Sequence, residues 1–269
     1  MMREGVRESK QISRNKPEQR FSGITPLGGL AVLLSLSIWF TLSEDGLGII
    51  SAVKFPPPTN VFGAVAVLGD RILTDSLSTM GRVLFGLLAG TLLGAVVGAL
   101  MVFSRRAGEF LHPLVESARP VPIIAVIPFF LMWFGIGEQG KLLLVTMGVF
   151  TLVVVNVVES IRNVPKIYLN AARTLGATER QIQRRIILPS IIPNMIGPLR
   201  VAAALTFTLV IAAEFMGAQS GIGYRILEAR RLFRPEIIFL GIALLGILAS
   251  LLDAVLQRSL KYVTRWTGR

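Results

Sequence analysis

The sequence predicts an all-α integral membrane protein with six transmembrane helices, and three observations support this. Apolar residues make up 52% of the 269 residues, charged residues make up only 16%, and the mean hydropathy is +0.65. A soluble domain carries about 25% charged residues. Because a membrane-spanning helix needs about 20 apolar residues, this apolar content suffices for about five to seven spans.

The residue content also excludes several classes of protein. The chain has no cysteine and one histidine, His112, so we expect no disulfide scaffold and no metal site of cysteines or several histidines. Its scattered carboxylates supply no paired catalytic set, so no enzyme activity is expected in this chain. The net charge is +12. The basic residues stand between apolar runs rather than on a folded polar surface, so no nucleic acid partner is expected.

Two polar ends flank one membrane domain. Residues 1–22 are polar and basic and show no apolar periodicity, which predicts a mobile cytoplasmic tail. The run Leu27–Leu42 lacks the format of a cleaved signal peptide, so it predicts an uncleaved anchor and a first span. The transmembrane domain is expected to cover 23–260, followed by a second short tail at 261–269.

Hydropathy places the spans in order along the chain. They are expected at about 25–43, 77–103, 113–134, 141–159, 194–217 and 237–257. The third contains Pro122 and Pro128, which predicts a kinked helix among neighbours that satisfy the freed carbonyls. After the first span, three prolines at 56–58 predict a stiff turn before a part-apolar stretch along the membrane face.

The basic residues orient these spans. Nineteen of the 28 Lys and Arg residues lie in four segments on one side of the membrane: 1–20, 104–119, 160–193 and 258–269. The opposite loop, 44–76, has only Lys54 and Arg71 against four acidic residues. Because cytoplasmic loops are enriched in Lys and Arg, both termini are predicted to be cytoplasmic.

The second span carries a glycine at every fourth position: Gly86, Gly90, Gly94 and Gly98. At helical spacing these glycines share one face, where a second backbone can approach closely. Either this face packs against another helix of the same subunit, or it forms a gating or dimer seam.

A glycine-rich stretch, Gly135–Leu142, separates the third and fourth spans. Its first seven residues match the phosphate-binding pattern G-x-x-x-x-G-K, but the eighth position is Leu142 where the pattern needs Ser or Thr. No strand precedes it. The stretch therefore predicts a tight turn between two helices, and this chain is not expected to bind ATP through it.

The longest polar cytoplasmic segment, 160–193, predicts two short helices. The first is expected to begin at Pro165 and to end at Gly176. The second is expected to be capped by Thr178 and to stop at Pro189. Two helices joined by a glycine turn form a module that can fit into a groove on a soluble partner.

Six residues of this segment keep the spacing A-A-x-x-x-G, nine residues, then I-x-L-P: Ala171, Ala172, Gly176, Ile186, Leu188 and Pro189. This pattern resembles the EAA loop of binding-protein-dependent ABC import permeases. The acidic residue that leads the family's pattern is replaced by Asn170. The replacement argues against an ion pair with the ATPase at that position but leaves docking in place.

The resemblance implies a fold, a set of partners and a location. The fold would be that of a type I, MetI-like, ABC importer permease, in which the 160–193 loop forms coupling helices that transmit ATP-driven closure. The implied partners are a second permease copy in a homodimer, two cytoplasmic ATPase subunits and an external solute-binding protein. ATP and magnesium would be bound by the ATPase, with no cofactor in this chain. The protein would cross the bacterial inner membrane several times.

Two further stretches, 76–86 and 213–224, resemble the nitrate, sulfonate and taurine subgroup of that family. They imply a translocation path for a small oxyanion. Relatives that import thiamine precursors, riboflavin or bicarbonate share much of these stretches and remain the alternative. An ion-coupled secondary transporter is a remote alternative, because inverted repeats with matched broken spans are not evident.

The ionisable residues Arg82, Glu214 and Asp253 lie in or near the predicted spans. Each would cost at least ~2.5–3.5 kcal/mol at the bilayer centre. Arg82 and Glu214 lie near the external ends of their spans and are candidates for the path or gate. Either they form an ion pair at the outer gate, or Arg82 meets a substrate anion. Asp253 lies near the cytoplasmic end and is expected to anchor a helix or to pair at an inner gate.

The segment 218–236 departs from the charge rule. It is predicted to be external yet carries four arginines, Arg225, Arg230, Arg231 and Arg234. In one explanation they lie on an amphipathic helix and meet lipid headgroups. In the other they contact the binding protein or funnel anions. Both explanations stay open at this point.

Overall fold

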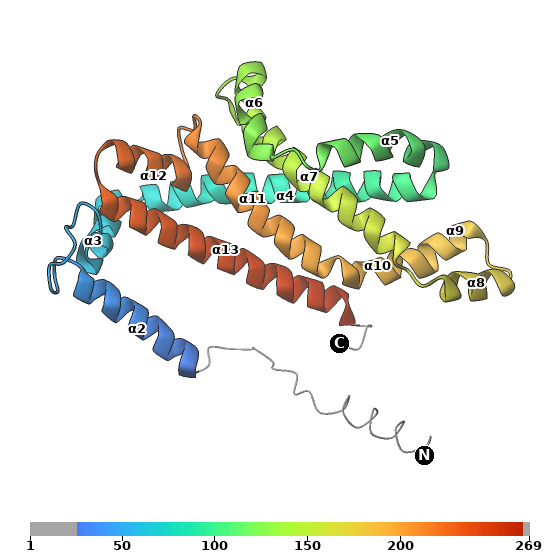
Figure 1. Ribbon diagram of the computed structural model, residues 1–269, viewed down its shortest axis with the longest axis horizontal. Helices are drawn as coiled ribbons and strands as arrows, with labels where there is room; N and C mark the ends of the chain where they lie inside the picture. The colour runs from blue at the N-terminus through green and yellow to red at the C-terminus, as the bar shows by residue number, and fades with distance from the viewer. Residues whose placement is uncertain (1–25, 266–269) are drawn as a thin grey trace, which may run out of the picture. The chain divides into compact units, whose positions relative to one another are not determined.

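The computed structural model describes residues 26–265, and over that range it contains helices and no strands (Figure 1). The predicted tail at 1–22 lies outside the described residues. The helices are α2 (Pro26–Leu42), α3 (Pro58–Leu68), α4 (Arg71–Phe103), α5 (Arg105–Ala118), η1 (Ile123–Val126), α6 (Ile127–Phe134), α7 (Glu138–Arg162), α8 (Lys166–Thr174), α9 (Glu179–Ile182), η2 (Gln183–Ile187), α10 (Leu188–Asn194), α11 (Ile196–Phe215), α12 (Ile222–Arg231) and α13 (Pro235–Val263). The described residues fall into two units, one that ends at Ala52 and one that begins at Val53.

In the first unit, α2 is apolar and uncharged on every side. Two of its hydroxyl groups are satisfied within the helix, since Ser35 Oγ donates to Ala31 O and Thr41 Oγ1 donates to Ser37 O, both at 2.9 Å. Such a helix suits a bilayer, where no water completes the hydrogen bonding. It matches the predicted first span, 25–43, but its 17 residues are fewer than the about 20 needed to cross a bilayer upright.

In the second unit, four helices are long and apolar enough to cross a membrane: α4, α7, α11 and α13. They coincide with the second, fourth, fifth and sixth predicted spans. Helix α13 ends at Val263 rather than near residue 257, and α4 begins at Arg71 rather than near residue 77. The turns before residue 77 hold Arg71, Thr74, Asp75 and Ser76, whose polar side chains hid this part of the helix from hydropathy, and the polar residues Asp75 and Thr79 lie in the first turns of α4. Both side chains are buried against other elements, so the helix extends further than its apolar run.

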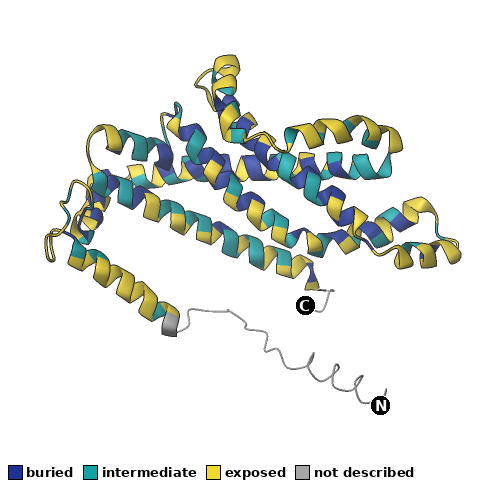
Figure 2. Cartoon of the chain, in the orientation of Figure 1, coloured by how far each residue is buried: buried dark blue, intermediate teal, exposed yellow. Residues whose placement is uncertain are grey.

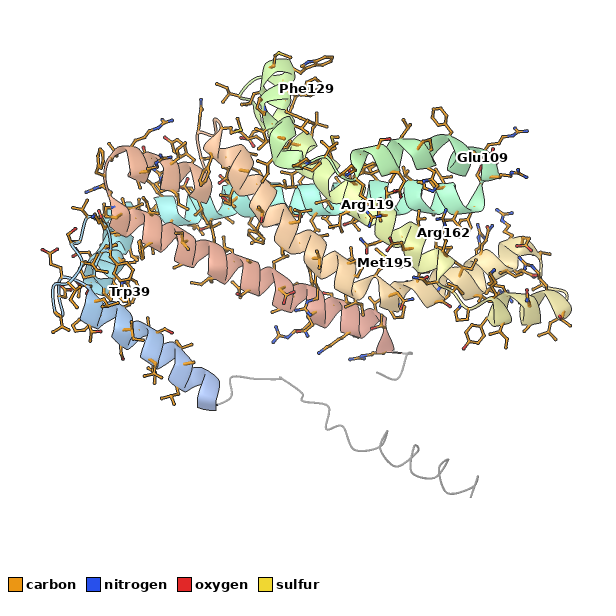
Figure 3. The ribbon with its side chains drawn as sticks, in the orientation of Figure 1. Trp39, Glu109, Arg119, Phe129, Arg162 and Met195 are labelled. Atoms are coloured by element: carbon orange, nitrogen blue, oxygen red, sulfur yellow. The ribbon has the colours of Figure 1, made fainter. Side chains whose placement is uncertain are left out.

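The third predicted span, 113–134, is not one kinked helix. Helix α5 and the η1–α6 pair form two arms bent by 90° at a break of four residues or fewer. The break lies after Arg119, which is labelled in Figure 3 and whose Nη2 approaches Glu159 Oε1 at 3.9 Å. The break ends at Pro122, whose backbone is extended. A proline lacks a backbone N–H, and it also disfavours helical backbone at the residue before it, so the helix cannot continue through this point. If this bent pair counts as one span, the second unit has five.

The core of the second unit lies where α4 packs along α7, the most extensive helix pair. Buried valines of α7 face the glycines of α4 at a spacing of four residues: Val145, Val149, Val153 and Val157. A Cβ at Gly90 would lie 2.6 Å from Val149 Cβ, and one at Gly94 would lie 2.8 Å from Val153 Cβ. The glycine face therefore packs within the subunit, as the first of the two alternatives states.

Figure 2 shows the buried residues where the long helices meet and exposed residues on their outer sides. Many of the exposed side chains on α4 are large and apolar, such as Leu77, Leu88 and Leu92. Contiguous apolar surface of this kind is rare on soluble monomers and is expected where lipid replaces water. The molecule is therefore built as a membrane protein with several membrane-crossing helices.

Candidate functional site

The segment 160–193 folds as two helices joined by a glycine turn, as predicted. Helix α8 begins directly after Pro165, whose φ of −59° suits a helix start. The turn that follows α8 contains Gly176 at φ +79°. A Cβ at this position would meet nothing within 4 Å, so the left-handed backbone rather than crowding favours glycine.

The second helix starts with a complete capping box. Thr178 Oγ1 accepts from Gln181 N–H at 3.3 Å, and Gln181 Oε1 accepts from Thr178 N–H at 2.8 Å. Across the turn, Arg173 Nε donates to Glu179 Oε1 at 2.9 Å. This hydrogen bond lowers the pKa of the Glu179 carboxyl and raises that of Arg173. Local contacts thus hold the two helices in a defined turn.

The second helix does not stop at Pro189, so that prediction is wrong. Residues 183–187 form a π-helix, in which Leu188 N–H donates to Gln183 O, five residues back. Pro189 then lies in the first turn of α10, where its missing N–H removes no hydrogen bond. The wider π-turn lets the helical path pass the proline and continue to Asn194.

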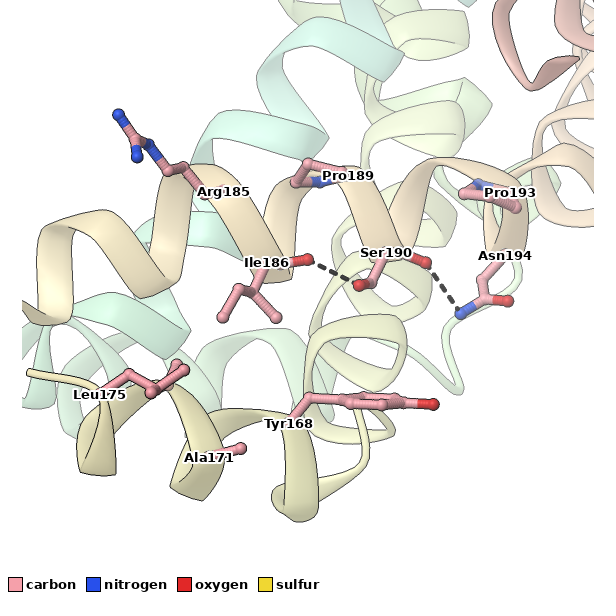
Figure 4. A pocket seen from close by; sticks show the side chains of 10 residues that line it. Tyr168, Ala171, Leu175, Arg185, Ile186, Pro189, Ser190, Pro193 and Asn194 are labelled. Atoms are coloured by element: carbon pink, nitrogen blue, oxygen red, sulfur yellow. Dashed lines mark hydrogen bonds between the residues drawn. The ribbon is translucent and has the colours of Figure 1, made fainter. Parts of the chain in front are cut away.

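An open groove with a cavity volume of about 700 Å³ runs between α8 and the η2–α10 helix (Figure 4). It is lined by Tyr168, Ala171, Ala172, Leu175, Arg185, Ile186, Pro189, Ser190, Pro193 and Asn194. Four of the seven coupling-loop residues named from the sequence line it. The others, Asn170, Gly176 and Leu188, belong to the same segment but do not line the groove. Its mostly apolar lining is the kind that takes a partner's side chains.

A second cluster of polar groups surrounds Arg82, whose side chain is 7% exposed. Its Nε and Nη2 donate to the two oxygens of Glu138 at 2.8 and 2.9 Å. Its Nη1 donates to Glu214 Oε1 at 2.5 Å and to Ser220 O at 2.9 Å, and Nη2 also donates to Ser220 Oγ at 3.3 Å. A guanidinium has five N–H groups, so every one has an acceptor. The ion pair with Glu214 is present, and in this arrangement Arg82 has no N–H free for an anion.

Glu214 is the fully buried acceptor in this cluster. Besides Arg82, it accepts from Thr79 Oγ1 at 2.9 Å and from Gly223 N–H at 2.7 Å. A buried carboxylate is tolerated only when it is paired and hydrogen-bonded, and three donors meet that condition here. Glu214 thereby joins α4, α11 and the start of α12.

The start of α12 depends on two glycines that let the backbone reach these charges. Gly221 has φ +116°, and a Cβ there would lie 2.7 Å from Arg82 Nη1. A Cβ at Gly223 would lie 2.8 Å from Glu214 Oε2. Side chains of α4 cap the same helix end, since Gly221 N–H donates to Asp75 Oδ1 and Ile222 N–H donates to Thr79 Oγ1, both at 2.9 Å. Acidic groups at a helix N-terminus satisfy its free N–H groups and its dipole.

Asp75 also binds one of the four arginines of 218–236. Arg225 Nε donates to Asp75 Oδ2 at 2.8 Å, and the Arg225 side chain is 14% exposed. Burial lowers the pKa of Arg225, but the hydrogen bonds and charges of Asp75 and Glu228 together outweigh burial, so the net pKa is raised. Arg230, Arg231 and Arg234 are exposed. The two explanations given for this charged segment therefore apply to three arginines, while Arg225 belongs to the interior.

Residues 86–269 match the family model for the inner membrane component of binding-protein-dependent transport systems. The chain belongs to this family. The match covers most of the second unit, including the groove, Glu138, Glu214 and the α12 turn.

Two relatives of this permease illustrate its similarity over nearly the whole chain. The taurine transport system permease protein TauC of Escherichia coli (strain K12) is 31% identical over 249 residues, which cover 90% of this chain and 89% of TauC. The putative aliphatic sulfonates transport permease protein SsuC of Bacillus subtilis (strain 168) is 31% identical over 258 residues, covering 94% of this chain and 91% of SsuC.

Solved structures show the same fold. A chain of the inward-facing MetNI methionine ABC transporter has a TM-score of 0.56 and 19% identity, covering 72% of this permease and 97% of that chain. A chain of an amino acid ABC transporter solved with histidines has a TM-score of 0.62 and 16% identity, covering 76% and 97%. The permease is thus a multi-pass membrane protein with the fold of MetI-like ABC importer permeases, and its relatives are transport subunits rather than enzymes.

Sequence reasoning about this permease missed several partners of its charged residues. Glu138 and Lys141 form an ion pair at 3.0 Å; the sequence places Glu138 in the glycine turn and Lys141 where the turn meets the fourth span, and their i, i+3 spacing on a helix indicates such a pair. Asp253 pairs with Arg200 through two hydrogen bonds of 2.6 and 2.7 Å. Arg200 lies inside the fifth predicted span, and an arginine in an apolar run indicates an acidic partner on a neighbouring helix.

Proposed function

We propose that this permease is the membrane subunit of an ATP-driven importer for a small sulfonate, with taurine as the first substrate to test. One observation carries the proposal: the likeness to TauC extends over about nine-tenths of both chains. The likeness to SsuC supports the same class of substrate. Nitrate, a thiamine precursor, riboflavin or bicarbonate is the alternative cargo for an importer of this class.

The proposal includes a complete membrane topology. Helix α2 and the bent α5–α6 pair supply the two spans beyond the four long helices, which gives six. An even number of spans leaves both termini on one side, and the excess of Lys and Arg there makes that side the cytoplasm. The relatives named above come from bacteria, which supports a location in the bacterial inner membrane.

The proposed partners follow from the family of this permease and from the groove on its coupling segment. We place two ATPase subunits on the coupling segment 160–193, a second copy of the permease beside this one, and a solute-binding protein on the external side. ATP and magnesium then belong to the ATPase subunits. The groove beside α8 supports the first assignment, because it is open, mostly apolar and built from the EAA-like residues.

Transport in this proposal couples two equilibria. Closure of the ATPase dimer on ATP draws the two coupling segments together. Because η2 joins this segment to α10 and α11 without a flexible loop, its movement is passed to the helix that carries Glu214. The ion pair of Arg82 with Glu214 then lies at the proposed gate, and the α4–α7 pair moves as one rigid body because its glycine face is tightly packed.

Reconstitution tests the proposal directly. The permease is co-purified with the ATPase and the binding protein from its own genome, inserted into liposomes and supplied with radiolabelled taurine. Uptake is expected when ATP is supplied on the side of the membrane where the ATPase subunits lie. It is expected to vanish with an ATPase that cannot hydrolyse ATP. Uptake that persists without ATP, or an assembled complex that imports a different solute but no sulfonate, would contradict it.

The coupling assignment has its own test within this assay. Gly176→Glu strains the left-handed turn and places a charge beside the groove, so taurine uptake is expected to be abolished while the subunit stays in the membrane. The control is Gly81→Ala, which lies outside the segment and meets open space. Unchanged uptake by Gly176→Glu would exclude this segment as the site of coupling.

A further inference from the structure

Glu138 is the exposed member of an otherwise buried charged group, here called the Arg82 cluster and defined as Thr79, Arg82, Glu138, Lys141 and Glu214. The side chain of Glu138 is 54% exposed, compared with 7% for Arg82 and 6% for Lys141. Glu138 is the first residue of α7 and follows the turn that contains Gly135 at φ +66°. Its carboxylate therefore lies at the surface of the cluster, between two buried cations.

Two carboxylates bind Arg82, but only one of them can leave. Glu214 is fully buried and also accepts from Thr79 and from a backbone N–H of α12, so its departure would leave several donors unpaired. Glu138 has no such additional contacts. Among the hydrogen bonds of the described residues, its carboxylate accepts only from Arg82 and Lys141. Rotation of one exposed side chain is enough to free the Nε–Nη2 edge of Arg82.

Departure of Glu138 would require a replacement anion. Lys141 Nζ donates to Glu138 Oε1 at 3.0 Å, its one ion pair within residues 26–265. Without Glu138, the Nε–Nη2 edge of Arg82 and the ammonium of Lys141 would be buried and unpaired, which is strongly unfavourable. The cluster thus holds one exchangeable anion position, closed at present by the protein's own carboxylate.

The donor geometry suits an anion with three oxygens. Three donors face the position: Arg82 Nε, Arg82 Nη2 and Lys141 Nζ. A carboxylate has two oxygens, so Glu138 Oε1 must serve both Nη2 and Nζ. A sulfonate has three oxygens and offers one to each donor, with the bidentate pairing that guanidinium groups favour.

We propose that a sulfonate displaces the Glu138 carboxylate and binds between Arg82 and Lys141, so that Glu138 is a displaceable counter-ion that selects for anions. The inference rests on the proposed function and names the residues that would recognise its substrate. Lys141 and Glu138 become specificity-determining residues, and the arrangement in which Arg82 has no free N–H is the closed, substrate-free arrangement of the site.

Anion binding to the permease, without transport, gives the first test. Glu138→Gln removes the competing charge, so sodium ethanesulfonate is expected to raise the Tm of the detergent-solubilised variant more than that of the wild type. Sodium chloride at equal ionic strength and the neutral ethyl methyl sulfone are expected to give no such difference. Glu228→Gln is the matched control, because Glu228 is also a partly exposed glutamate bound to a largely buried arginine, Arg225; its response should equal the wild type.

The second test uses uptake. In the assembled transporter Glu138→Gln is expected to lower the KM for taurine several-fold and to lower the maximal rate, because the anion is released more slowly. If Glu138→Gln does not fold, Glu138→Asp keeps the charge but shortens its reach, and the same direction of change is expected. The inference would be overturned if the folded Glu138→Gln variant showed the same rise in Tm with ethanesulfonate, and the same KM for taurine, as the wild type. Absence of sulfonate uptake by the wild-type complex would instead overturn the proposed function, whatever the Tm measurements give.

Discussion

Single residues of the Arg82 cluster stabilise this permease by satisfying buried charge. Glu214 lies on α11, yet its donors come from Arg82 and Thr79 on α4 and from the backbone of α12. Polar contacts of this kind substitute for part of the hydrophobic effect, which does not drive helices together inside lipid. The ends of three helices are therefore held together by one carboxylate.

Substitution of that carboxylate has a large expected cost. Glu214→Gln keeps the shape but leaves the buried Arg82 with one fewer counter-charge, so the free energy of unfolding is expected to fall by about 3–5 kcal/mol. Thermal unfolding of the purified permease in detergent measures this loss. Asp253→Asn is the control, because its pair with Arg200 is half-exposed whereas Glu214 is fully buried. An equal loss of unfolding free energy in the two variants would show that burial does not determine the cost of removing the carboxylate.

The close packing of α4 against α7 depends on the glycines of α4, which have no side chain. Each glycine of the ladder faces a valine, and at Gly90 the backbone oxygen of Thr146 would lie only 2.8 Å from an added Cβ. A backbone atom cannot rotate away as a side chain can, so the two helices would have to separate. Glycine is retained there despite its cost within a helix.

Two alanine substitutions in the same helix separate these effects. Gly90→Ala is expected to destabilise the permease by about 1–3 kcal/mol through overpacking. Gly81→Ala adds the same methyl group where nothing lies within 4 Å, so it is expected to be neutral or to stabilise by about 0.5–1 kcal/mol. Thermal unfolding of both variants gives the comparison, and a loss at Gly81 equal to that at Gly90 would refute the packing explanation.

The proposed topology places the coupling segment and α12 on opposite sides of the membrane. Along the chain, α11 is the one long apolar helix between Lys166 and Arg230. A single membrane crossing between them puts the two residues on opposite sides. The chain contains no cysteine, so single introduced thiols report without background. Both positions are exposed and lie outside the Arg82 cluster.

Labelling with a membrane-impermeant maleimide tests this topology. In intact cells Arg230→Cys is expected to react and Lys166→Cys is not, whereas in inverted membrane vesicles the pattern is expected to reverse. Detergent-solubilised protein provides the control, since both thiols should then react. Reaction of both variants from the same side would contradict the six-span arrangement with cytoplasmic termini.

The sequence predicted those features of the fold that depend on local composition. Apolar runs located α2 and the four long helices, and the prolines, glycine and threonine of 160–193 predicted the ends of α8 and the cap of α9. The Pro189 stop was wrong, because a π-turn rearranges several hydrogen bonds at once and leaves no signature in single residues. The 90° break near Pro122 was predicted only as a kink, because proline indicates a change of direction without its angle.

The membrane class, the helical segments and the family could all be predicted from composition and short residue spacings. Tertiary structure alone decided the partners: Glu138 and Lys141 around Arg82, Asp75 with Arg225, and valines against the glycine ladder. The physical reason is that a buried charge must find a counter-charge, but many residues on several helices can supply it. Only the packing of α4, α7, α11 and α12 brings particular ones within hydrogen-bond distance.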